Sequence, residues 1–168
     1  MPQVESVRSS HHRRVWWLVV AGVVVLAAVG YLLWRLFPTA ADTVKQADAL
    51  NAKRQYLQAE ALLEGAYGRA LTDGDRALIR SRQAATASNR GDLAKALGYY
   101  QDQNRLQPSH YLVLINIGEL AERLDRKSVA ADAYRQAVEL LKQSPKGVTT
   151  DAQIEQYEAR VKSLEEGS

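Results

Sequence analysis

The feature that most constrains the fold is a side-chain pattern that occurs twice, 34 residues apart, between residues 77 and 144. Its matched pairs are Ala84 with Gly118, Ala87 with Ala121, Ala96 with Ala130, and Tyr100 with Tyr134. A third copy precedes these at an interval of 37; its members are Ala47, Leu50, Tyr56, Ala59, Leu63 and Ala66. Paired antiparallel helices approach closely only where contact residues are small, and one such hairpin cannot bury its apolar face alone. The pattern therefore predicts an all-α chain of stacked helix hairpins.

The interval and the alanine followed four residues later by tyrosine, at Ala96 and again at Ala130, resemble the tetratricopeptide repeat (TPR) family. The resemblance covers residues 40–144 and implies an α-solenoid of three TPR-like helix hairpins. Their expected ranges are 40–71, 77–110 and 111–144. Gly91 lies where a tight turn requires positive φ, and Asp125 replaces that glycine in the last copy. The interval between the first and second copies is 37 residues instead of 34, and these three extra residues predict a longer turn over residues 72–75.

A further helix is expected at the carboxyl end, over residues 149–166. Its apolar stripe at helical spacing is Ile154, Tyr157, Val161 and Leu164. A terminal helix with a polar outer face closes the exposed end of a solenoid, so we expect a C-terminal capping helix. A helix that binds a partner is the alternative interpretation.

Residues 15–34 contain no charged side chain, and about 20 helical residues span the ~30 Å core of a bilayer. This predicts an N-terminal transmembrane helix, a signal anchor over residues 15–37. Three arginines precede the run, at positions 8, 13 and 14, so residues 1–14 are expected to form a cytoplasmic tail. The repeats are then periplasmic, on a single-pass protein of the cell inner membrane. Cleavage near Ala41 is the alternative.

Charge and composition exclude several functions. Residues 1–38 hold four arginines and one glutamate, whereas residues 39–168 hold 18 basic and 18 acidic groups. A neutral repeat domain predicts no nucleic-acid partner. The chain has no cysteine, and His110 is the one histidine among the repeats. We therefore expect no enzyme, no cofactor, no metal and no small-molecule substrate.

The resemblance implies that the first helix of each repeat lines a concave groove for a partner protein. The residues at these template positions are Val44, Lys45, Asp48, Asn51, Leu78, Ser81, Arg82, Ala85, Ser88, Asn89, Leu112, Ile115, Asn116, Glu119 and Arg123. The family members that clamp a chaperone's terminal carboxylate carry lysines and asparagines there. This chain departs from that set, so no such clamp is predicted.

The functional hypothesis is a membrane-tethered adaptor or scaffold, similar to small membrane-anchored bacterial TPR proteins. It would bind a protein partner in the groove, contact the lipid bilayer through residues 15–37, and help to organise a cell-envelope complex. Secretion, pilus, polysaccharide-export and cytochrome-maturation machines are all compatible. A membrane-anchored periplasmic chaperone for exported chains is the alternative, and self-assembly through the solenoid is a third possibility.

Overall fold

The computed structural model describes the backbone of residues 5–36, 38–144 and 151–166, and the side chains of residues 16–32, 38–144 and 151–166. These residues form eight helices and, within the described ranges, no strand. The chain divides into two units, Met1–Thr39 and Ala40–Ser168, which we describe separately.

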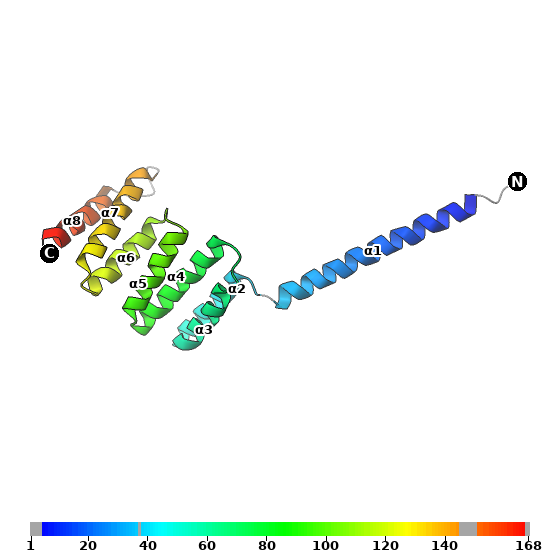
Figure 1. Ribbon diagram of the computed structural model, residues 1–168, viewed down its shortest axis with the longest axis horizontal. Coiled ribbons are helices and arrows are strands. Elements are labelled where there is room, and N and C mark those ends of the chain that lie inside the picture. Colours follow the sequence, from blue (N-terminus) through cyan, green and yellow to red (C-terminus); the bar gives the residue numbers. More distant parts are fainter. Residues whose placement is uncertain (1–4, 37, 145–150, 167–168) are drawn as a thin grey trace. The chain divides into compact units, whose positions relative to one another are not determined.

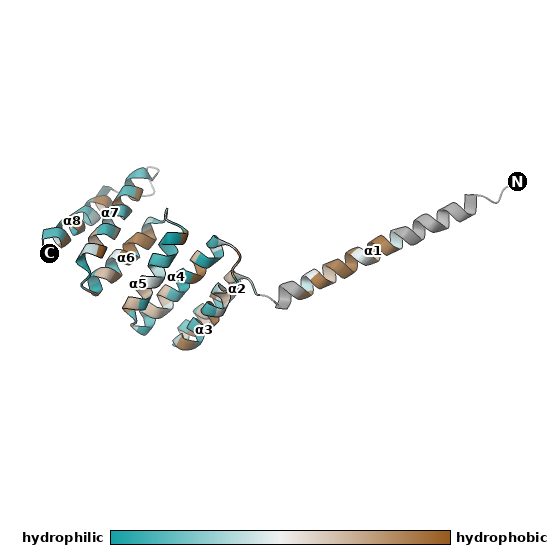
Figure 2. Cartoon of the chain, in the orientation of Figure 1, coloured by the Kyte–Doolittle hydropathy of each residue, from teal (hydrophilic) through white to brown (hydrophobic). Residues whose placement is uncertain are grey.

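The first unit is the single helix α1, Glu5–Leu36, whose described side chains are mostly hydrophobic and exposed (Figure 2). None of the helices, as far as their residues are described, is long and apolar enough to cross a membrane. This finding contradicts the predicted transmembrane anchor at 15–37. It equally contradicts the predicted single-pass inner-membrane location with a cytoplasmic N-terminus and periplasmic repeats.

The second unit is a TPR-like solenoid of three helix hairpins and one final helix (Figure 1). The first hairpin pairs α2 (Ala40–Ala52) with α3 (Tyr56–Tyr67), and the second pairs α4 (Asp73–Arg90) with α5 (Leu93–Leu106). The third pairs α6 (Tyr111–Arg123) with α7 (Lys127–Gln143), and α8 (Asp151–Glu166) packs on α7. The all-helical solenoid predicted from the repeat is thus confirmed.

The three hairpin turns are built alike. Arg54, Gly91 and Asp125 occupy the same repeat position, and all three have positive φ, at 58°, 88° and 55°. In each turn the next residue donates its backbone N–H to the carbonyl five residues back, at 2.8–2.9 Å, as in a Schellman motif. The sequence predicted this conformation for Gly91, and the structure shows that an arginine and an aspartate adopt it too.

The extra residues of the first interval lengthen a helix rather than a turn. Thr72 is the N-cap of α4, and its side chain accepts a hydrogen bond from the backbone N–H of Asp75 at 3.0 Å. This cap starts α4 at Asp73, so the segment predicted as a longer turn forms the first helical turn instead. The predicted start of the last helix near Thr150 lies outside the described residues.

The small residues of the repeat form the contacts between helices. Ala47, Ala84, Ala96 and Ala130 are fully buried, as is the Tyr134 ring. A Cβ placed on Gly118 would lie 2.5 Å from Cε1 of Tyr134, so this ring occupies the space of the missing side chain. Small residues at the repeat positions therefore permit the close helix approach that the pattern predicted.

The last helix is attached differently, since none of its described residues is buried. Tyr157 stacks on Tyr134 with the ring centroids 5.5 Å apart, and Arg160 donates from Nε to the Glu122 carboxylate at 2.9 Å. Lys142 of α7 forms an ion pair with Glu158 at 2.8 Å. Tyr157 thus provides an apolar contact for α8, and ion pairs lie beside it.

Candidate partner-binding surfaces

We call the surface formed by the predicted groove residues of α2, α4 and α6 the front face. Seven of those residues are exposed: Lys45, Asp48, Leu78, Asn89, Leu112, Glu119 and Arg123. Six are half-buried: Asn51, Ser81, Arg82, Ala85, Ser88 and Asn116. Two are buried in the core, Val44 at 6 % exposure and Ile115 at 8 %, and these pack the fold instead of offering surface.

Polar contacts join α2 to α4 on the front face. Arg82 pairs with Asp48, with Nη2 3.7 Å from Oδ2. Asn51 donates from Nδ2 to the Thr86 hydroxyl at 2.9 Å, and that hydroxyl donates to the Arg82 carbonyl at 2.8 Å. Two buried atoms here, Nε of Arg82 and Oδ1 of Asn51, have no hydrogen-bond partner among the described residues. These two atoms lie inside the contact between α2 and α4, so the polar groups that the front face offers to a partner are its exposed ones.

Between α4 and α6 the front face is built differently. The helices α2 and α4 are in contact, whereas within the described ranges α4 and α6 are not, although each packs on α5. Burial raises the pKa of the half-buried Tyr100 of α5; the charge of Arg82 opposes this shift and that of Glu119 adds to it. Tyr100 therefore lies within the electrostatic influence of α4 and of α6, between the charges of Arg82 and Glu119.

The charge of Glu119 also raises the pKa of two further tyrosines, Tyr134 and Tyr157. Burial is the largest cause that raises the pKa of Tyr134, and the neighbouring Glu122 charge adds to it. The pKa of Tyr157 is raised in the same direction, again mainly by burial and then by Glu119. These phenols stay neutral near neutral pH, but Tyr134 is fully buried and donates its hydroxyl to Glu122, so it is not offered to a partner.

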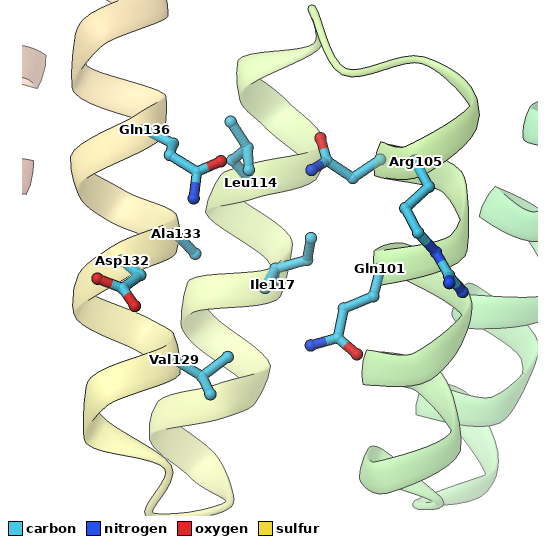
Figure 3. A pocket seen from close by; sticks show the side chains of 9 residues that line it. Gln101, Arg105, Leu114, Ile117, Val129, Asp132, Ala133 and Gln136 are labelled. Atoms are coloured by element: carbon cyan, nitrogen blue, oxygen red, sulfur yellow. The ribbon is translucent and has the colours of Figure 1, made fainter.

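The opposite side of the solenoid carries a groove at each junction between hairpins. Residues such as Arg80 of α4 and Leu114 of α6 point away from the front face, since they lie about half a helical turn from Arg82 and Asn116. The first back groove lies between α3 and α5 over α4, with a volume of about 500 Å³. The second lies between α5 and α7 over α6, with a volume of about 460 Å³ (Figure 3).

The first back groove is organised by one arginine. The Arg80 guanidinium lies 3.6 Å from the ring centroid of Tyr67 and 5.1 Å from that of Tyr99. Its Nη1 donates to Gln83 at 2.8 Å, and its Nε lies 3.4 Å from the Asp102 carboxylate. Beside it, the Glu60 carboxylate accepts from Arg90 at 2.8 Å and from Lys95 at 2.6 Å, and this bond raises the pKa of Lys95. Cations and carboxylates of the same chain pair with one another in this groove, although Nε of Arg80 has no hydrogen-bond partner among the described residues.

The second back groove has the same position in the repeat and different chemistry. Leu114 replaces Arg80, Ile117 replaces Gln83, and Ala133 replaces Tyr99. Figure 3 shows the side chains of α5 on one wall, those of α7 on the other, and Leu114 and Ile117 of α6 between them. Sequence reasoning missed both grooves. A comparison of the 34-residue copies for their differences would have found the signal at these three positions.

Among the described residues, no group of three or more histidine, cysteine, aspartate or glutamate side chains could hold a metal ion.

The known proteins that resemble this chain do so in structure. The Sgt2 TPR domain from Aspergillus fumigatus superposes with a TM-score of 0.59 at 20% identity, covering 78% of this chain and 82% of that one. The first TPR domain of human RPAP3 gives 0.56 at 13% identity, covering 77% and 98%. The MamA RS-1 ArsTM double mutant gives 0.56 at 20% identity, covering 64% and 58%. No protein-family model and no curated protein matches the sequence. The chain therefore has a TPR-like fold.

Proposed function

We propose that the protein is a protein-interaction scaffold whose front face binds a segment of a partner protein. One observation carries the proposal: the first helices of a TPR-like solenoid present exposed and half-buried polar side chains on one face. Main-chain groups of a bound segment would bond to the exposed polar side chains, and Leu78 and Leu112 would contact its apolar side chains.

The function proposed for the protein is scaffolding alone. A place in a cell-envelope complex and a tether to the bilayer both depended on the predicted transmembrane helix, and the structure contradicts that helix. We therefore propose a protein partner and no compartment.

Charge balance on the front face defines the partner further. Arg82 is already paired with Asp48, and Lys45, Glu119 and Arg123 are exposed charges of both signs. Mixed charges of this kind favour a partner segment that is itself mixed in charge and discriminate against a strongly acidic or basic one.

A photo-crosslinking residue at Ala85, in the centre of the front face, tests the proposal. We expect one stoichiometric adduct from cells that express the full chain, and its loss when Arg82→Glu and Glu119→Lys are combined. Arg105→Glu, an equally drastic change behind the solenoid, serves as the matched control and is expected to leave the adduct intact. An adduct that persists with both front-face charges reversed contradicts the proposal.

The chaperone alternative makes a different prediction in the same experiment. A chaperone for unfolded chains requires a broad apolar face, and on the front face the exposed large apolar side chains among the described residues are Leu78 and Leu112. Many unrelated adducts in place of one would favour the chaperone over the scaffold.

A further inference from the structure

The second back groove has an apolar floor, and its walls carry neutral amides together with the charged side chains of Arg105 and Asp132. Leu114 and Ile117 of the floor are 3% and 4% exposed. The amides of Gln101 and Asn104 come from α5. Figure 3 shows Gln136 of α7 on the opposite side from Gln101. A smaller pocket of about 300 Å³ shares Leu114 and Gln136 and prolongs the groove toward the turn between α5 and α6.

The two charged side chains that line this groove are paired within the chain. Arg105 forms an ion pair with Asp102, and Asp132 forms one with Arg135 at 2.7 Å. An occupant with a net charge would lose hydration here without meeting an unpaired opposite charge. The groove therefore favours an uncharged occupant.

One polar atom in the groove lacks a partner. Asn104 Oδ1 is buried and accepts no hydrogen bond from the described residues. Carboxamide side chains carry both donors and acceptors, as peptide groups do, and they stand on both walls. An occupant with backbone N–H and C=O groups would bond to the exposed amides of Gln101 and Gln136, and it would reach the amide of Asn104 once that side chain turns toward the groove.

The chain itself shows how such a groove is occupied. At the preceding junction the aromatic ring of Tyr99 and the guanidinium of Arg80 line the equivalent groove. The ring and the cation are both absent at the second junction, where alanine and leucine take their positions. A foreign apolar side chain can lie where the first groove carries its own ring.

We propose that the second back groove binds a short, extended, uncharged peptide segment of a partner protein. The apolar side chains of this segment lie on Leu114, Ile117 and Ala133, and its backbone bonds to the wall amides. This surface is separate from the front face, so the two proposals can fail independently.

Selection of a displayed library of random heptapeptides on the immobilised full chain tests the proposal. We expect enrichment of apolar, uncharged sequences, whose affinity is then measured by fluorescence anisotropy with both peptide ends capped. Ala133→Tyr places a ring where Tyr99 stands in the preceding copy, and should weaken binding about tenfold or more. Ser128→Tyr, on the exposed side of the same helix, is the matched control and should leave binding unchanged.

A second variant keeps the test decisive if Ala133→Tyr does not fold. Asn104→Leu removes the unsatisfied acceptor and should raise the melting temperature while it weakens peptide binding about tenfold. A purely structural role for Asn104 would not separate these two effects. No enrichment, enrichment of charged peptides, or unchanged binding by the groove variants overturns the proposal. Loss of binding in Arg82→Ala instead would place the peptide on the front face and overturn it as well.

Discussion

The two back grooves occupy the same position in successive repeats and are stabilised by different forces. At the first junction Arg80, Gln83 and their carboxylate partners are joined by hydrogen bonds and ion pairs. The second junction buries Leu114 and Ile117 with other apolar groups. The repeat pattern therefore specifies where the helices pack, and the residues between the patterned positions determine what each junction can bind.

The largest expected difference concerns the tyrosine shared by both copies. Tyr134 is fully buried and stacked on Tyr157, whereas Tyr100 at the same position is half-buried. Tyr134→Ala should lower the free energy of unfolding by about 4 kcal/mol, and Tyr100→Ala by about half as much, because less apolar area is lost there. Urea titrations of the full chain, followed by circular dichroism, measure both values. Equal losses would contradict the difference in burial between the two tyrosines.

A smaller effect is expected at the glycine that faces Tyr134. Gly118→Ala should improve helix propensity, yet the new Cβ would meet the tyrosine ring at 2.5–2.8 Å. We expect a loss of about 2–3 kcal/mol from overpacking. Stabilisation by Gly118→Ala would show that the ring can move aside.

The first repeat suggests the compensating change. There Ala47 stands at the position of Gly118 and Leu63 at that of Tyr134, and both are fully buried. Adding Tyr134→Leu to Gly118→Ala should therefore recover part of the loss, and a double-mutant cycle measures the coupling. Purely additive free energies would contradict a direct contact between the two positions.

Arg80 of the first back groove is expected to contribute somewhat less to the free energy of unfolding. Arg80→Leu copies the residue of the second groove and removes the contacts to Tyr67, Gln83 and Asp102. We expect a loss of about 2 kcal/mol, since Gln83 is buried and loses a donor. Thermal unfolding at low and high salt separates the causes, because the wild-type advantage should shrink with salt if the ion pairs contribute. Leu114→Met, a volume-conserving change at the matching position, is the control and should show no such salt dependence.

The small residues allowed the solenoid to be predicted from the sequence. Ala84, Ala96 and Ala130 are buried at the helix contacts, as the spacing required. The prediction of a transmembrane anchor was wrong: it followed from a run of 20 uncharged residues, and none of the helices, as far as they are described, is long and apolar enough to cross a membrane. Thr72 shows a finer limit: it caps the next helix, and this capping converted an expected loop into a helical turn.

The candidate surfaces were predictable only in part. The repeat pattern predicts that the first helices of the hairpins share one face. It does not predict that Val44 and Ile115 are buried, because their burial depends on how far each helix rotates when it packs. The back grooves required residues from three helices to be compared position by position. For example, Ala133 leaves open the space that Tyr99 lines one repeat earlier, and neither residue signals this by itself.

The smallest expected change in stability concerns the turns of the second and third hairpins. Gly91 turns the second hairpin with φ of 88°, and Asp125 turns the third with φ of 55° at the same repeat position. A side chain in this conformation costs about 1 kcal/mol, so Gly91→Ala should destabilise the protein by about that amount. Asp125→Gly relieves the same strain but adds freedom to the unfolded chain, which leaves a net gain of about 0.5 kcal/mol.

Melting temperatures of the two variants test this pair, with Arg54→Gly as the matched change in the first hairpin, where φ is 58°. The gains at Arg54 and Asp125 should agree, because both side chains are exposed and lose no packing when they are removed. A gain at one turn and a loss at the other would mean that the three turns, though alike in their backbone hydrogen bonds, contribute differently to stability. The repeats would then differ in their turns as well as in their grooves.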